Sequence, residues 1–230
     1  MAMYFMFMLP GILLMVWAQS KVKGSYSKYS KVANSRGLTG AQAARMVLDD
    51  NGLHDVQIEM VKGELSDHYD PRKRVLRLSQ GIHSVPSIAA VAVAAHEAGH
   101  AIQHATGYAP LKTRTAIVPI VNIGSNLGIF VIIGGVLLNM AGMTWLGIAL
   151  FGLSTVFALV TLPVEFDASK RAKVALVHAG IVDGGVANGP EGKGVDNMLD
   201  SAAWTYVAGF AASLLTLLYY VMMVAGMRRD

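Results

Sequence analysis

The sequence contains no cysteine, so it has neither a disulfide framework nor a thiolate ligand for a metal. Any zinc site must therefore use histidine, aspartate or glutamate side chains. Charge is also scarce: 15% of the residues are charged, whereas a soluble domain carries about 25%. Because 53% of the residues are hydrophobic, the composition places the chain among membrane proteins.

The formal net charge of +4 does not by itself indicate a nucleic-acid partner. The basic residues flank apolar segments, which is typical of the cytoplasmic face of a membrane protein. We therefore expect the chain to contact the lipid bilayer and to bind no nucleic acid.

Residues 1–18 carry no charge and are about long enough to span a bilayer. No basic residue precedes this apolar run, as it would in a signal peptide, and lysines follow it from Lys21 onward. The positive-inside rule then predicts that residues 1–19 are a transmembrane anchor whose N-terminus lies outside the cytoplasm.

Residues 115–164 also lack any charge. A single helix of that length would measure about 75 Å, far more than a bilayer requires. The sequence NMAGMT at 139–144 is the natural place for a break. We therefore expect a transmembrane hairpin with spans at 117–138 and 144–163.

The remaining segments are polar, except for a last apolar run that predicts a C-terminal transmembrane helix within 202–230. A hairpin returns the chain to its starting side, so residues 20–114 and 165–201 should both be cytoplasmic. The expected fold is a mainly α membrane protein with about four transmembrane helices and a small α+β module.

Within residues 20–114, Thr39 is the expected N-cap of a helix that ends before Asn51-Gly52. Residues 56–61 and 74–79 have the composition and alternation of strands. The segment 67–71 should connect them through an Asp-Pro turn.

A further helix, expected from about Ser84 to His104, carries the sequence HEAGH. Residues four apart on a helix differ by about 40° around the axis and 6 Å along it, so His96 and His100 can bind one metal ion. Glu97 lies about 100° from His96, beside the ligands. There it can accept a proton from a water that zinc activates and pass it to a leaving amine.

A catalytic zinc needs a third protein ligand and an open position for water. His104 lies about 12 Å along the helix from His96, too far to share one ion. We prefer Glu165, because it should open a polar helix directly after the hairpin, over Asp167, which would face the opposite side. The predicted ligands are thus His96, His100 and Glu165 around one Zn²⁺ ion.

Four segments together resemble the YugP-type membrane-bound neutral zinc metallopeptidases: DHYDP (67–71), LRLS (76–79), SIAAVAVAAHEAGHAIQHA (87–105) and LPVEFDASKRA (162–172). The resemblance extends from the N-terminal span to WTYVA at 204–208. It implies a bacterial membrane protease of zincin-like fold. Its site would comprise His96 and His100 as ligands, Glu97 as general base and Glu165 as third ligand.

The HtpX-type membrane proteases are more distantly similar. They have an aspartate that orients a metal-binding histidine where this chain has Ser169, and Ser169 could take its place one turn after Glu165. In zincins the substrate lies along an edge strand, for which residues 74–79 are the candidate here. His178 is expected to be an ordinary surface histidine rather than an oxyanion-stabilising group.

The predicted function is that of a zinc-dependent endopeptidase in the bacterial inner membrane. It would cleave membrane-associated protein or peptide substrates on the cytoplasmic side; its oligomeric state stays open. One alternative is a site-two-type intramembrane protease, but the apolar run at 85–95 is short and soon followed by polar groups. Another is a catalytically latent scaffold with a zinc site, although a structural zinc needs no base such as Glu97.

Overall fold

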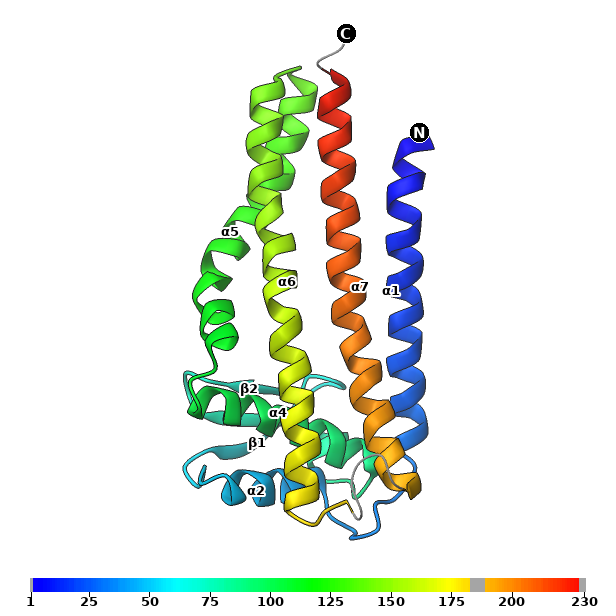
Figure 1. Cartoon of the computed structure of the whole chain (residues 1–230), viewed down its shortest axis with the longest axis vertical. Helices are drawn as coiled ribbons and strands as arrows, with labels where there is room; N and C mark the ends of the chain where they lie inside the picture. Colours follow the sequence, from blue (N-terminus) through cyan, green and yellow to red (C-terminus); the bar gives the residue numbers. More distant parts are fainter. Residues whose placement is uncertain (1, 183–188, 228–230) are drawn as a thin grey trace. The chain divides into compact units, whose positions relative to one another are not determined.

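The computed structural model describes residues 2–182 and 189–227 (Figure 1). The chain forms two compact units. The helical unit comprises Met1–Gln19, Lys112–Pro163 and Trp204–Asp230, and the sheet unit comprises Ser20–Leu111 and Val164–Ala203.

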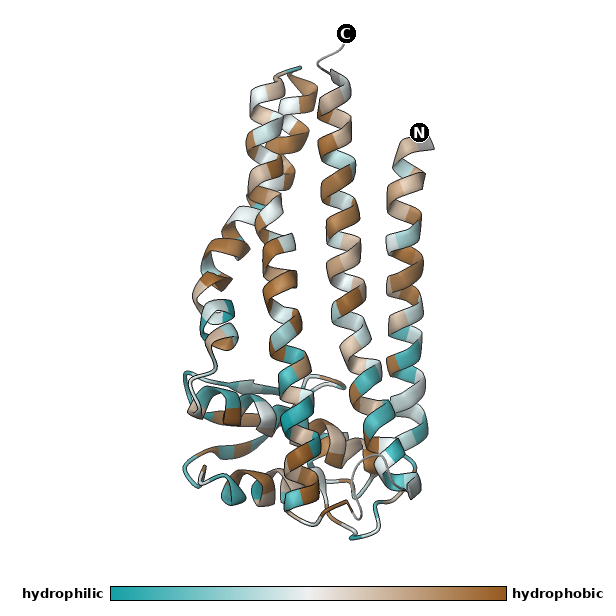
Figure 2. Cartoon of the chain, viewed as in Figure 1, coloured by the Kyte–Doolittle hydropathy of each residue, from teal (hydrophilic) through white to brown (hydrophobic). Residues whose placement is uncertain are grey.

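Four long helices contribute to the helical unit: α1 (Ala2–Tyr29), α5 (Ala109–Leu137), α6 (Ala141–His178) and α7 (Gly189–Met227). All four are long and apolar enough to cross a membrane. Figure 2 shows apolar residues dominating the parts of these helices that belong to the helical unit. The expectation of about four helices that are long and apolar enough to span a membrane is therefore confirmed.

The helices are longer than the expected spans. The hairpin breaks at 138–140, and α6 then continues through Pro163 to His178. The expectation that Glu165 opens a separate helix is thus wrong. Pro163 removes one backbone hydrogen bond, and this loss is not enough to end the helix. An apolar run marks only the part of a helix that suits lipid. The polar continuations of α1 and α7 were therefore not predicted, and the polar helix after Glu165 was predicted as a separate element.

Glycines allow the backbones of α5 and α6 to approach closely within the helical unit. A Cβ built on Gly128 would lie 2.7 Å from the Phe151 nitrogen, and one on Gly147 would lie 2.6 Å from the Ile132 nitrogen. A hydrogen bond of 2.7 Å between Thr155 and Ser213 joins α6 to α7. Small residues and hydroxyl pairs of this kind are typical of helix packing in membranes.

The sheet unit contains three strands and three shorter helices: β1 (Gln57–Val61), β2 (His68–Asp70), β3 (Val75–Ser79), α2 (Gly40–Asp50), α3 (Gln80–His83) and α4 (Ile88–Ala105). Thr39 caps α2 in a capping box with Gln42, as expected at this N-terminus. The two expected strands appear as β1 and β3, each within one residue of its expected start.

Two expectations about the sheet are wrong. Residues 67–71 are not only a turn, because they contain β2. The sheet order is β1-β3-β2, with β1 parallel and β2 antiparallel to β3, so residues 74–79 form the central strand rather than an edge. The strand β2 has only three residues, and an alternation of apolar and polar residues cannot be recognised over so short a segment.

The helix α4 is held in the core of the sheet unit. Its alanines from Ala89 to Ala101 are buried in one core cluster with the inner side chains of α2 and with Leu76 and Leu78 of β3. Small side chains let the α4 backbone approach its neighbours on several sides. The closest approach is at Gly99, where a Cβ would lie 2.5 Å from the carbonyl oxygen of Ala168 in α6.

We predict that Gly99→Ala destabilises the protein, because the added methyl group forces α4 and α6 apart. Overpacking of this kind costs about 1–3 kcal/mol, which should appear as a lower Tm of the protein in detergent. The matched control is Gly24→Ala in α1, where a Cβ meets nothing within 4 Å and alanine favours the helix. Equal melting temperatures for the two variants would contradict the close contact.

Candidate metal centre

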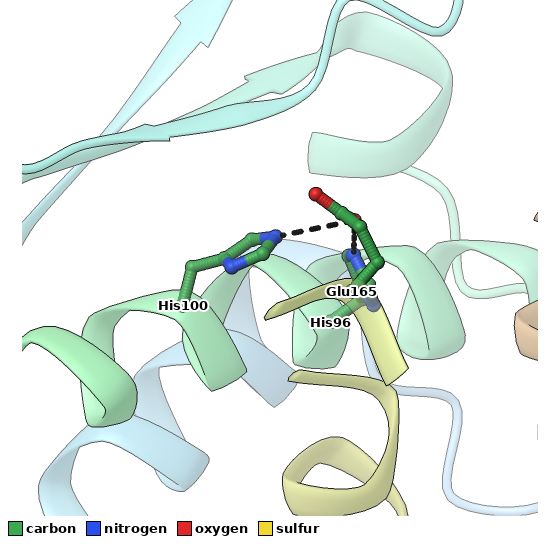
Figure 3. A group of neighbouring side chains, drawn as sticks. All are labelled: His96, His100 and Glu165. Carbon is green, nitrogen blue, oxygen red and sulfur yellow. Dashed lines mark hydrogen bonds and ion pairs between the residues drawn. The ribbon is translucent and has the colours of Figure 1, made fainter. Parts of the chain in front are cut away.

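Three side chains converge on one point in the sheet unit. His96 and His100 come from α4 and Glu165 comes from α6 (Figure 3). Glu165 Oε2 lies 3.3 Å from His96 Nε2 and 3.6 Å from His100 Nε2. One potential ligand atom from each residue lies within 4.8 Å of the other two.

These separations suit a tetrahedral zinc. Zinc binds imidazole nitrogen and carboxylate oxygen at about 2.0–2.2 Å, which places two ligand atoms of a tetrahedron about 3.3–3.6 Å apart. The two distances to Glu165 Oε2 fall in this range. Two imidazoles and one carboxylate also leave a fourth position, so the donor set fits a catalytic rather than a structural zinc site.

The electrostatic environment favours a cation. Glu165 is 2% exposed, and Glu97 and His100 are buried as well. Burial by itself lowers the pKa of His100, but the hydrogen bond to Glu165 and the charges of Glu97 and Glu165 outweigh it and raise this pKa above its ordinary value. Two carboxylates in one buried site are stabilised by positive charge between them.

Each imidazole has a second contact through its other ring nitrogen. His96 Nδ1 lies 3.1 Å from the Ser169 hydroxyl, and His100 Nδ1 lies 3.0 Å from Gln103 Oε1. Contacts at the far nitrogen fix the orientation of a metal-binding imidazole. The contact between Ser169 and His96 is the one considered from sequence, and the contact with Gln103 was not foreseen.

Glu97 is positioned by β2. The Tyr69 backbone N–H donates a hydrogen bond of 3.0 Å to Glu97 Oε2. The Tyr69 hydroxyl in turn lies 2.9 Å from His104 Nδ1. Burial raises the pKa of Tyr69, so its hydroxyl stays neutral.

The other candidates from sequence lie outside the group of three. His104 contacts Tyr69, as just described. Asp167 accepts hydrogen bonds from Gln103 and Arg171 instead of facing the histidines. His178 is a largely exposed histidine that pairs with Asp50.

Tyr69 and Gln103 are the site residues that sequence reasoning missed. Gln103 could have been found, because it follows His100 by three residues and so lies on the same face of the helix. Tyr69 acts through its backbone and belongs to a strand that was not predicted, so no comparable signal existed for it.

Comparison with known proteins identifies relatives of the whole chain. Residues 4–225 match the family described as "Putative neutral zinc metallopeptidase". The chain is also 48% identical over 209 residues to the "Putative membrane protease YugP" of Bacillus subtilis (strain 168), covering 91% of each chain. No solved structure matches the chain.

The match covers nearly the entire sequence and includes both α4 and the part of α6 that carries Glu165. By this extent of similarity, the chain belongs to the YugP-type family described as "Putative neutral zinc metallopeptidase".

Proposed function

We propose that this protein is a zinc-dependent endopeptidase that hydrolyses peptide bonds of membrane-associated protein or peptide substrates. The observation that carries the proposal is the convergence of His96, His100 and Glu165, with Glu97 next to them on α4. The description of the family, and the name of its Bacillus relative, support the same activity.

The three ligands would hold one Zn²⁺ ion, which supplies Lewis acidity toward a substrate carbonyl and lowers the pKa of water. His96 and His100 contribute neutral nitrogen donors, and Glu165 contributes one negative charge. The ion together with its three ligands would therefore keep one net positive charge, which suits the stabilisation of a developing oxyanion.

Glu97 is suited to move a proton. Its Oε2 accepts the Tyr69 N–H, so the carboxylate is fixed in orientation and Oε1 is the atom that would take the proton from the attacking water. Glu97 would then donate this proton to the leaving amine. A latent scaffold would have no use for a base held in this way.

The place of the site supports hydrolysis outside the hydrocarbon layer. The helix α4 is not among the four candidate spans found in the described residues, and all three ligands belong to the sheet unit. We infer that this unit lies in the cytoplasm of a bacterial cell, because lysines follow the first apolar run.

Glu97→Gln should abolish hydrolysis and keep zinc. The amide preserves the shape of the side chain and can still accept the Tyr69 N–H, but it cannot take up a proton. The expected loss is about 100- to 10,000-fold in kcat, measured on a peptide substrate beside the zinc content of the same preparation. Wild-type cleavage by purified Glu97→Gln would overturn the assigned role of Glu97.

Glu165→Ala should lower zinc affinity by more than about 100-fold, because losing a ligand should cost more than losing an outer contact of a ligand. His104→Ala is the matched control, since it removes a nearby side chain outside the group of three. Zinc content after dialysis should fall in the first variant and stay at the wild-type level in the second. Equal zinc in wild type and Glu165→Ala would exclude Glu165 as a ligand.

The chain has no cysteine, so single cysteines can report the side of the membrane. Met140 lies exposed in the turn between α5 and α6, and Lys73 lies exposed between β2 and β3. In intact cells a membrane-impermeant maleimide should label Met140→Cys, and it should label Lys73→Cys only after permeabilisation. The opposite pattern would place the active site outside the cytoplasm.

A further inference from the structure

Gln103 is a fully buried amide whose two ends serve different partners. Its Oε1 lies 3.0 Å from His100 Nδ1. Its Nε2 lies 2.8 Å from the Val164 carbonyl oxygen and 2.8 Å from Asp167 Oδ2. The side chain has no exposed surface, so its hydrogen-bond partners are protein atoms rather than bulk solvent.

The orientation of the amide follows from the chemistry of its partners. A backbone carbonyl can only accept a hydrogen bond, so the atom facing Val164 must be the NH₂ group. The same holds for Asp167, which accepts from Arg171 Nε at 2.5 Å and is therefore a carboxylate. The reversed amide would place an oxygen against two acceptors, so Oε1 must be the atom that faces His100.

This orientation decides where His100 carries its hydrogen. An amide oxygen can only accept, so His100 Nδ1 must donate and must bear the hydrogen. In a neutral imidazole with the hydrogen on Nδ1, the free lone pair is on Nε2. Nε2 is the atom that lies 3.6 Å from Glu165 Oε2, on the side of the candidate metal centre.

The other histidine has no such constraint. His96 Nδ1 faces the hydroxyl of Ser169, which can either donate or accept. Ser169 can therefore support both tautomers of His96, whereas Gln103 permits only one tautomer of His100. The metal-binding tautomer is therefore fixed by a neighbouring side chain in His100 but not in His96.

Gln103 also fixes the two ligand-bearing helices against each other. Val164, whose carbonyl it binds, directly precedes Glu165 on α6. The same amide therefore sets the orientation of His100 and the position of the backbone next to Glu165.

We propose that Gln103 is a positioning residue that holds His100 in its metal-binding tautomer and fixes α4 against α6 at the third ligand. The inference deepens the proposed function and rests on it, because it concerns zinc binding at the same three ligands.

The first test is zinc affinity of the full-length protein in detergent, measured by competition with a chromophoric chelator. Gln103→Met keeps the length of the side chain but removes both its acceptor and its donor. We expect its zinc affinity to fall about 10- to 100-fold, as for other outer contacts of metal ligands. The matched control is Gln80→Met, at an exposed glutamine at the start of α3, which should bind zinc as wild type does.

A second pair of variants separates hydrogen bonding from packing. Gln103→Glu places a carboxylate against Asp167, so it should lose zinc affinity to a similar extent. Adding Asp167→Asn restores a donor opposite the new carboxylate, which still accepts from His100 Nδ1. The Val164 carbonyl remains without its donor, so the recovery is expected to be partial. We expect the double variant to recover at least about tenfold in zinc affinity over Gln103→Glu, although both have nearly the same shape.

The outcomes distinguish this inference from the proposed function. If wild type itself holds no zinc, the proposed function fails, and the inference with it. If wild type binds zinc and Gln103→Met binds it equally well, Gln103 is not a positioning residue, while the proposed function stands. If Gln103→Met does not fold, as judged by thermal unfolding without zinc, the Gln103→Glu pair decides: recovery supports the inference and its absence overturns it.

Discussion

The contact between the backbones of α4 and α6 is the constraint on which the candidate metal centre depends. Gly99 lies between the two histidines in sequence, and its missing side chain lets the Ala168 carbonyl approach to a distance that no Cβ would allow. Glu165 has only a short side chain, so it can reach both imidazoles only if α6 is this close. The glycine of HEAGH therefore contributes to the site through the space it leaves, and the histidines and glutamate contribute through their chemistry.

The polar groups around this contact are stabilised as a set. Buried imidazoles, carboxylates and amides each cost free energy unless they find partners. Here the Nδ1 atom of each histidine has a hydrogen-bond partner, which is Ser169 for His96 and Gln103 for His100. Gln103 also donates to Asp167, which accepts a second hydrogen bond from Arg171. The removal of one member leaves its neighbours with unmet hydrogen bonds in the protein interior. Zinc binding and the packing of α4 on α6 should consequently depend on the same few side chains.

Sequence patterns predicted the local parts of this arrangement and missed those that depend on tertiary contacts. His96 and His100 follow from helical spacing, and the apolar helices follow from composition. Glu165 was chosen because the hairpin returns the chain, and the structure does bring it to the histidines, but as part of a continuous α6 rather than at the start of a new helix. The strand β2 was missed because three residues carry too little alternation, and the role of the Tyr69 backbone was missed with it.

The position of β2 also changes which strand could receive an extended peptide. The central strand β3 has a neighbour on each side, so its backbone groups are already paired and it cannot add another strand. The free edges of the sheet belong to β1 and β2. The outer edge of β2 is not entirely free, because the Tyr69 N–H donates to Glu97. An edge strand offers N–H groups on its outer side only at alternate residues, so this three-residue strand has few of them. One of these groups, the Tyr69 N–H, already orients the proposed general base and is not available to an added peptide strand.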